Sequence, residues 1–285
     1  MTHRVAVIGD ALIDIVDGRQ IPGGAAFNVA VGLAKLGADV DLITMLADDE
    51  PGRALLRHAA EHGVRVHATD APHGTATATA TRVGESMEYV FNEAGRKRFF
   101  DVASKAAVIA EADCVVVSCV PLESDAQTEA LQALQRMPIP FVLDANPRPG
   151  YLRDNDPATV AAFAANLRRL AAAATMLKLS DEDTRLLFEL EPHDAAEQLL
   201  AAGLEVALVT EGPAGASIRT ASLHEQRPIA HMDAPIVDTI GAGDATNATL
   251  ALALLDEQPW GEALERAMLV AAATCRAPGG ELQLP

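Results

Sequence analysis

The chain has 285 residues, 49% of them hydrophobic and 22% charged, so it carries enough apolar material for a sizeable core and is not a disordered polymer. Its 22 Lys and Arg residues against 40 Asp and Glu residues give a net charge of −18, which argues against binding to nucleic acid. No apolar run is long enough to span a membrane and no signal peptide precedes the first apolar segment, so we expect a cytoplasmic protein without membrane contact.

Short apolar runs alternate with longer amphipathic segments along the chain, and we interpret the former as buried strands and the latter as helices. Strands are expected at 5–9, 40–44, 114–118, 141–144, 176–179 and 206–210. Helices are expected at 25–36, 52–62, 123–136, 157–173, 194–202, 242–256 and 261–275. This alternation predicts one α/β domain over residues 1–285, with a central, mostly parallel sheet that helices cover on both faces.

Residues 75–100 interrupt the alternation, because no helix pattern separates their apolar segments. Residues 75–82 alternate Thr with Ala, a period of two that is typical of a strand. Two further strands are expected at 87–91 and 96–100, the first of them after a turn that contains Gly84. We interpret 75–100, with a contribution from about 11–22, as a small β-sheet lid or dimer contact. An ordinary meander at the edge of the main sheet fits the pattern equally well.

The strongest local signal is the sequence Asp-Thr-Ile-Gly-Ala-Gly-Asp at 238–244, which opens the penultimate expected helix. Gly241 and Gly243 let the backbone turn tightly and direct unpaired N–H groups toward an anion. Asp244 would then lie beside that anion, where a carboxylate can take a proton from a nucleophile that attacks phosphorus. A plain helix N-cap is the alternative. The segment is neither a Walker A loop nor a dinucleotide fingerprint, since Thr246 stands where the third glycine would be.

A second signal lies at the first expected helix. Gly23 and Gly24 permit a ligand to approach the backbone closely, and Asn28 offers both a donor and an acceptor, which suits a neutral ligand rich in hydroxyl groups. Asp14, just beyond the first strand, could accept hydrogen bonds from the same hydroxyl groups. Each of these residues is also common in turns and helix caps.

Gly23-Gly24 with Asn28 early in the chain and the glycine-rich segment at 238–244 late in it resemble the ribokinase-like sugar kinases, also called PfkB carbohydrate kinases. Four further segments resemble family motifs in the same order, namely 9–14, 48–52, 144–148 and 209–215. The resemblance implies a ribokinase-like fold with a β-lid over a sugar site. It also implies an ATP-dependent transfer of phosphate to a primary hydroxyl of a small sugar, with ATP and Mg²⁺ as cofactors.

The resemblance assigns roles to particular residues. Asp244 would act as the base, while the backbone N–H groups of Ala242, Gly243 and Asp244, in the turn that Gly241 opens, would hold the charge that develops on the transferred phosphoryl group. Sugar hydroxyls would be held by Asp14, Gly23, Gly24, Asn28, Asp144, Asn146 and Arg148. The nucleotide would be flanked by Lys178, Ser180, Thr210, Gly212 and Gly215, with Asp183 holding Mg²⁺ through water. Asp238 and Ile240 would place oxygen atoms near a monovalent cation such as K⁺, if one binds.

The sequence departs from the family pattern at three places. Ala47 replaces the glycine before Asp48, Ser180 and Asp183 stand where the family has Asn-x-x-Glu, and Thr246 stands where an aromatic residue is common. Because 144–148 resembles fructokinase-like members, fructose is the expected substrate. The alternatives are 2-keto-3-deoxygluconate, ribose or a nucleoside, and, in another class, a non-catalytic sugar-binding regulator. A homodimer through the lid is also expected.

Three other features compete for a function. His58-Ala59-Ala60-Glu61-His62 matches an inverted zinc-protease motif, but we interpret it as the solvated face of a helix. The basic and aromatic run at 96–100 is interpreted as a turn at the edge of the lid rather than a nucleic-acid site. The three cysteines, Cys114, Cys119 and Cys275, lie among apolar residues and are expected to be buried thiols without a disulfide.

Overall fold

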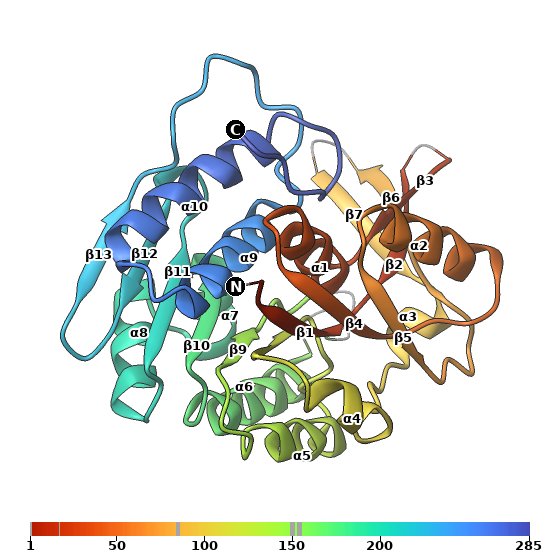
Figure 1. Cartoon of the computed structure of the whole chain (residues 1–285), viewed down its shortest axis with the longest axis horizontal. Coiled ribbons are helices and arrows are strands. Elements are labelled where there is room, and N and C mark those ends of the chain that lie inside the picture. Colours follow the sequence, from red (N-terminus) through yellow and green to blue (C-terminus); the bar gives the residue numbers. More distant parts are fainter. Residues whose placement is uncertain (1, 17, 84–85, 149–151, 153–155) are drawn as a thin grey trace.

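A large β-sheet runs through the centre of the computed structural model, which describes residues 2–16, 18–83, 86–148, 152 and 156–285 (Figure 1). Within these residues the sheet has nine strands in the order β13-β12-β11-β10-β9-β8-β1-β4-β5. The strands are β1 (Arg4–Gly9), β4 (Asp39–Met45), β5 (Arg65–Thr69), β8 (Cys114–Ser118), β9 (Phe141–Asp144), β10 (Met176–Ser180), β11 (Val206–Thr210), β12 (Ala216–Arg219) and β13 (His224–Arg227). Neighbours from β11 to β5 pair in parallel, whereas β12 and β13 are antiparallel additions at one edge.

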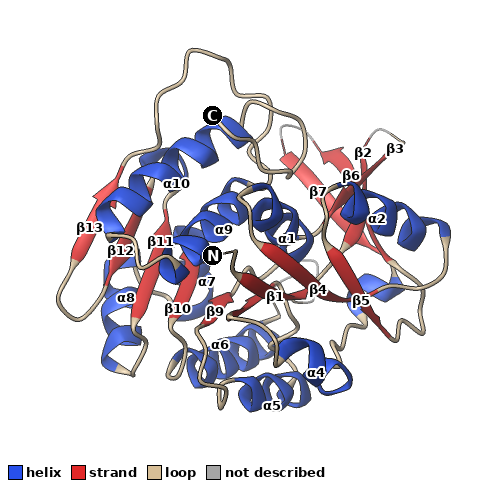
Figure 2. Ribbon diagram, viewed as in Figure 1, coloured by secondary structure: helices blue, strands red, loops and turns tan. Residues whose placement is uncertain are grey.

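Helices cover both faces of this sheet (Figure 2). Val5 and Val7 of β1 enter one hydrophobic core while Ala6 and Ile8 enter the other, because successive side chains of a strand point to opposite faces. The first core is closed by α1 (Ala25–Lys35), α2 (Glu50–Glu61), α9 (Ala242–Leu255) and α10 (Trp260–Thr274). The second is closed by α4 (Ala106–Ile109), α5 (Asp125–Leu134), α6 (Pro157–Ala171), α7 (Asp181–Phe188) and α8 (Pro192–Ala201).

The predicted α/β class with a mostly parallel sheet is confirmed, and β8, β9 and β11 have the predicted bounds. The structure adds β5, α7, β12 and β13, which the sequence patterns did not predict. β13 has alternating exposed and half-buried polar residues and no apolar run, so it carries no signal of a buried strand. α7 follows β10 without a loop and begins with three acidic residues, which hides its amphipathic pattern.

A second sheet adjoins the end of β1 and has the strand order β3-β2-β6-β7. Its strands are β2 (Leu12–Val16), β3 (Arg19–Gly23), β6 (Ala76–Val83) and β7 (Ser86–Phe91). β2 pairs in parallel with β6, while the β2–β3 and β6–β7 pairs are antiparallel. Leu12 of β2 follows β1 after two residues, so this sheet lies at the carboxyl end of β1 (Figure 1).

The strand predicted at 96–100 is wrong, because the chain forms the short helix α3 (Glu93–Arg96) and then an irregular segment. Asn92 caps this helix by accepting a hydrogen bond of 2.9 Å from the N–H of Gly95, and this cap turns the chain away from β7. β2 and β3 complete the sheet instead. The expected turn at Gly84 lies outside the described residues.

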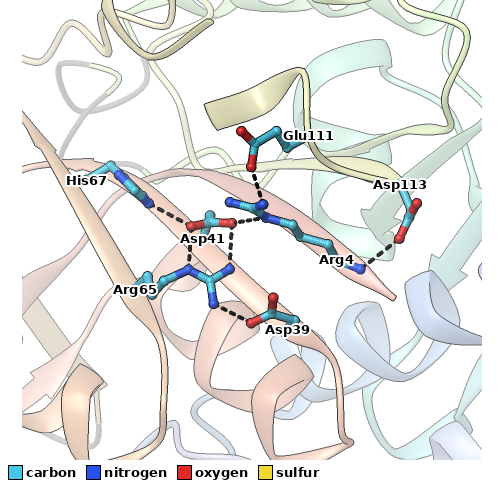
Figure 3. Close-up of polar contacts among 7 residues, drawn as sticks. All are labelled: Arg4, Asp39, Asp41, Arg65, His67, Glu111 and Asp113. Carbon is cyan, nitrogen blue, oxygen red and sulfur yellow. Dashed lines mark hydrogen bonds and ion pairs between the residues drawn. The ribbon is translucent and has the colours of Figure 1, made fainter. Parts of the chain in front are cut away.

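An ion-pair cluster joins the amino-terminal halves of β1, β4 and β5 (Figure 3). Asp41 is only 1% exposed, and it accepts hydrogen bonds from Arg4 Nε at 2.7 Å and Arg65 Nε at 2.9 Å. His67 Nε2 lies 2.6 Å from the same carboxylate. Burial alone would raise the pKa of Asp41, but the hydrogen bonds from the two guanidinium groups and the imidazole hold it well below its usual range.

Two expectations on composition can be compared with the described structure. Cys114, Cys119 and Cys275 are buried free thiols, as predicted. Among the described residues, we find no helix with the length and hydropathy that crossing a membrane would require.

Candidate active site

Polar side chains gather where the parallel strands of the large sheet end. Asp10 follows β1, Asp144 ends β9, and Ser180 and Thr210 end β10 and β11 as paired neighbours. Ser118 ends β8 opposite Asp144. The crevice outside the carboxyl ends of parallel strands is the usual ligand site of open α/β sheets, so this edge is the candidate site.

Asp244 is held in the first turn of α9 by a glycine-dependent start. Gly241 has φ +77, and a Cβ there would overlap the backbone of Gly280, so only glycine fits. Asp244 is 5% exposed, and its Oδ2 accepts a hydrogen bond of 2.8 Å from Nδ2 of Asn28. Asn28 lies in α1, which packs along α9, and it is itself buried. The two helices thus bring the early and the late sequence motif into direct contact.

A buried lysine adds a positive charge beside the start of α9. Lys178 Nζ donates to Oδ1 of Asp144 at 3.0 Å, and Ser118 Oγ donates to the other oxygen of that carboxylate at 2.9 Å. A Cβ on Gly243 would lie 3.2 Å from the same Nζ, so the ammonium group sits against the glycine backbone of the helix start. The N–H groups at a helix start and an adjacent ammonium group together favour an anion at this point.

The carboxyl groups of the site have perturbed pKa values. Burial foremost, and then the charge of Asp144, raise the pKa of Asp244 to about 6, against the lowering effect of the Asn28 hydrogen bond and Lys178. Burial lowers the pKa of Lys178, but the neighbouring carboxylates outweigh it and raise that pKa overall. A carboxylate with a pKa near 6 is ionised at neutral pH, yet it accepts a proton more readily than an exposed one.

Asp14 and the glycines that precede α1 form a second part of the site. A Cβ on Gly23 would overlap Oδ2 of Asp14, and Gly24, with φ +102, packs against the backbone of Asp10. Burial first, and then the nearby charge of Asp10, raise the pKa of Asp14 to about 6. Arg148 opposes this effect on Asp14 and also on Asp244.

The loop after β9 carries the other predicted sugar contacts. Asn146 is half-buried with φ +38, whereas Arg148 is exposed. The positive charge of Arg148 lowers the pKa values of Asp10, Asp14 and Asp244, so it acts on all three carboxylates. The loop therefore connects the Asp14 part of the site to the Asp244 part.

The predicted nucleotide and magnesium residues include a structural cap. Ser180 Oγ accepts from the N–H of Asp183 at 3.0 Å, and Asp183 Oδ2 accepts from the N–H of Ser180 at 2.7 Å. This capping box begins α7 and occupies one carboxylate oxygen of Asp183, a buried residue. The other oxygen is a hard donor of the kind Mg²⁺ prefers, which fits a contact through water.

The remaining predicted residues lie on connecting segments. Thr210 Oγ1 donates to the carbonyl of Leu179 at 3.4 Å. Gly212 begins a 3₁₀ turn with φ +52, and a Cβ on Gly215 would overlap the carbonyl of Arg227. These glycines therefore shape the β11–β12 connection.

Asp238, predicted to lie beside a monovalent cation, caps a turn with both of its oxygens. Oδ1 accepts from the N–H of Ile240 at 3.0 Å, and Oδ2 accepts from the N–H of Gly279 at 3.2 Å. The side chain of Asp238 thus joins the segment before α9 to the segment after α10. The Ile240 residue itself is 37% exposed.

Sequence reasoning missed two residues of this site. Asp10 is buried, accepts a hydrogen bond of 3.2 Å from the N–H of Ala26, and raises the pKa of Asp14. A carboxylate directly after the first strand could have been recognised from that position alone. Gly280 packs against Asn28 and against Gly241, where a larger residue would not fit. The Gly-Gly pair at 279–280 is a signal of close approach, but the sequence does not show what it approaches.

Arg98 belongs to the basic run at 96–100 and turns inward. Its Nη1 donates to the carbonyl of Cys119 at 2.7 Å, and its side chain lines a pocket with Asp10 and Phe100. One of the three cations of this run is therefore used inside the fold rather than on a nucleic-acid surface.

The family match defines the class of this protein, a phosphotransferase with a sugar as acceptor. Residues 3–285 match the pfkB family carbohydrate kinase, and the chain belongs to this family. It is 30% identical to the aminoimidazole riboside kinase of Salmonella typhimurium, over 92% of this chain and 84% of that protein. It is 28% identical to a fructokinase of Escherichia coli over 100% of this chain and 97% of the relative.

Solved structures have the same fold. The crystal structure of aminoimidazole riboside kinase from Salmonella enterica, complexed with aminoimidazole riboside and an ATP analogue, has a TM-score of 0.79 at 25% identity, covering 97% of this chain and 95% of the other. The structure of fructokinase from Vibrio cholerae O395 in its fructose, ADP and calcium-bound form has a TM-score of 0.80 at 21% identity, covering 98% and 94%. The second likeness concerns the fold alone.

Proposed function

We propose that this sugar kinase transfers the γ-phosphoryl group of ATP, bound with Mg²⁺, to a primary hydroxyl group of fructose. The observation that carries the chemistry is the buried carboxylate of Asp244, with a pKa of about 6, at the glycine-rich start of α9. Fructose is supported by the resemblance of 144–148 to fructokinase-like members and by the fructokinases among the relatives.

In this proposal each group has one task. Asp244 accepts the proton of the attacking hydroxyl, and Asn28 keeps the carboxylate oriented through its hydrogen bond. The N–H groups of residues 242–244 and the ammonium group of Lys178 stabilise the negative charge of the transferred group. Asp14, Gly23, Gly24 and the 144–148 loop hold the sugar. Asp244 is only 5% exposed, so the sugar reaches it after a movement of the segments that cover it.

The nucleotide lies, in this proposal, along the ends of β10 and β11. Ser180, Thr210, Gly212 and Gly215 flank it, and the oxygen of Asp183 that is not used in the helix cap holds a water ligand of Mg²⁺. Bound Mg²⁺ neutralises charge on the phosphate oxygens. Asp238 and Ile240 would lie beside a monovalent cation such as K⁺.

The second sheet acts, in this proposal, as a lid that is part of the same domain. β2 carries Asp14 and β3 ends at Gly23, so the sheet delivers sugar-binding residues directly. β7 is its edge strand, and Val90 on it is 62% exposed, which supports a homodimer formed through the lid. Sedimentation should then give the mass of two chains. Because ATP is the donor, we place the activity in the cytoplasm.

A substrate panel tests the proposed acceptor. ADP release would be measured with fructose, 2-keto-3-deoxygluconate, ribose and aminoimidazole riboside, each with MgATP, and fructose should give the highest kcat/KM. The relatives that act on aminoimidazole riboside make that nucleoside-like compound the second candidate. A higher kcat/KM with it would replace fructose as the substrate. If the protein bound a sugar but released no ADP with any of these acceptors, it would be a non-catalytic regulator.

A further inference from the structure

Two histidines of the α2 helix meet a glutamate from the C-terminal segment. His58 lies in the last turn of α2, and His62 is the residue directly after this helix. The two histidines are four residues apart, so their imidazoles share one face of the helix. Glu281 belongs to the segment after α10, which returns to pack against α1 (Figure 1). One ligand atom from each of the three side chains lies within 4.8 Å of the others. The sequence motif at 58–62 has thus acquired a third donor that no spacing in the sequence predicted.

The two distances to the Glu281 carboxylate are close to those between the ligands of a tetrahedral metal ion. Oε2 of Glu281 lies 3.1 Å from Nε2 of His58 and 3.6 Å from Nε2 of His62. Bonds of about 2.0–2.2 Å to zinc place tetrahedral ligands about 3.3–3.6 Å apart. A simple ion pair needs only one imidazole for one carboxylate oxygen, whereas here two nitrogen atoms converge on the same oxygen. We propose that His58, His62 and Glu281 bind one Zn²⁺ ion, with water as the fourth ligand.

The exposure and protonation of the three side chains suit this role. They are 24%, 22% and 32% exposed, so an ion and a water ligand can enter from solvent. An unperturbed histidine is mostly neutral at pH 7, and the neutral imidazole is the form that binds metals. Two imidazole nitrogens and one carboxylate oxygen are a donor set that zinc accepts with an open fourth position.

The groups around the cluster have defined effects on it. Glu61 Oε2 lies 3.9 Å from Nδ1 of His58, too far for a hydrogen bond, so Glu61 adds a negative charge near the cluster without holding the imidazole. Lys35 Nζ contacts Oε1 of Glu281 and donates to the carbonyl of Leu282 at 2.8 Å. Lys35 therefore orients the carboxylate so that Oε2 faces the histidines, but its charge repels a cation. We expect an affinity below that of a site with cysteine ligands.

A bound ion would fasten the C-terminal segment next to the candidate active site. Glu281 follows Gly280, which packs directly against the side chain of Asn28. The ring of Phe27 lies 5.7 Å from the ring of His58. The ion would thus link α2 to the segment that covers the Asn28–Asp244 pair. In this proposal the ion acts as a structural link between α2 and the C-terminal segment.

The test uses the full chain, stripped with a chelator and then titrated with Zn²⁺ in a calorimeter. We expect one ion per chain, and a spectrum of tetrahedral coordination when Co²⁺ replaces Zn²⁺. His58→Gln, His62→Gln and Glu281→Gln should each weaken binding by at least about 10-fold. His193→Gln is the matched control, because His193 pairs with Glu197 at 3.3 Å on an exposed helix face where the described residues supply no third donor, and binding should not change.

Two results would overturn the proposal. One is the absence of stoichiometric zinc binding by the wild-type chain. The other is equal binding by the wild type and by His58→Gln and His62→Gln variants whose circular dichroism shows an intact fold. Hydrogen exchange provides a separate readout of the fastening, since Zn²⁺ should slow exchange in residues 279–283 of the wild type but not of His62→Gln. Unchanged exchange in the zinc-loaded wild type would contradict the fastening.

Discussion

Asn28 donates a hydrogen bond of 2.8 Å from its Nδ2 to Oδ2 of Asp244, and both side chains are buried. The bond favours the ionised carboxylate, whereas burial and the charge of Asp144 favour the protonated one. The balance places the pKa of Asp244 at about 6. The same contact that joins the two sequence motifs therefore also tunes the proposed base.

Asp244→Asn tests the base directly. The substitution keeps the shape and the acceptor for Asn28 but removes the ability to take a proton. We expect kcat to fall by about 10²–10⁴-fold, roughly 3–5 kcal/mol of transition-state stabilisation. Calorimetry should show that sugar and ATP still bind. Near-native turnover would remove Asp244 from the mechanism.

The rate should depend on pH with an acidic limb near 6. A base must be ionised to accept a proton, so kcat should be constant well above pH 6 and should fall as pH decreases through about 6. Asp14 also has a pKa of about 6, but as a proposed sugar contact it should affect KM instead. Asp14→Asn is therefore the control, and it should leave the limb in kcat in place. A flat kcat profile between pH 5 and 8 would contradict the assignment of the base.

Two substitutions should move this limb in opposite directions. Asn28→Ala removes a hydrogen bond to the ionised form, so the pKa of Asp244 rises and the limb moves to higher pH. Asp144→Asn removes a neighbouring negative charge, so the pKa falls and the limb moves to lower pH. The kcat profiles of both variants would be measured on the same substrate. Shifts of the same sign would show that the charges around Asp244 are not those described.

The sequence predicted the part of the site that depends on local backbone geometry. Glycines before a helix pattern indicate a tight turn at the helix start, and the 238–244 segment does begin α9 with Gly241 in the left-handed region. The register of parallel strands could not be predicted from one strand at a time. The contact between Lys178 and Asp144 depends on the pairing of β10 with β9, which only the assembled sheet defines.

Long-range packing of irregular segments was equally hidden. Glu281 and Gly280 lie after the last helix and carry no periodic pattern, yet one meets the histidines of α2 and the other meets Asn28. The wrong strand at 96–100 arose in the same way, because its aromatic residues fit a strand pattern while the cap at Asn92 decides the conformation. Local sequence patterns predict helices and strands. Side-chain caps and contacts with distant residues determine where these elements end and what they pack against.

Asp183→Asn separates a magnesium role from a helix cap. The amide keeps an oxygen for the N–H of Ser180, so the capping box and the free energy of unfolding should change little. The lost charge should weaken the water-mediated hold on Mg²⁺ and raise the Mg²⁺ concentration needed for half-maximal rate. Ser180→Ala is the complementary variant, which should cost about 0.5–2 kcal/mol of stability through the lost cap. An unchanged Mg²⁺ requirement in Asp183→Asn would leave Asp183 as a cap alone. Excess EDTA should abolish the activity of every variant.

Asp41→Asn should destabilise the fold without touching the site, since Asp41 lies in the amino-terminal half of β4 and the site lies at the carboxyl ends of the strands. The carboxylate is 1% exposed and receives two guanidinium groups, so its removal should lower the free energy of unfolding by about 1–3 kcal/mol at pH 7. Asp39→Asn is the control. Asp39 pairs with Arg65 at an exposed position, where a loss of no more than about 1 kcal/mol is expected.

The pH dependence of this destabilisation has a definite sign. Because the pKa of Asp41 is lowered in the folded state, its contribution is complete above the unfolded value of about 4 and is lost as pH falls below it. Urea unfolding of the wild type and Asp41→Asn should therefore differ most at neutral pH and converge in acid. A difference that persists unchanged at pH 3 would mean that packing, rather than the charge of Asp41, holds β1, β4 and β5 together at this edge.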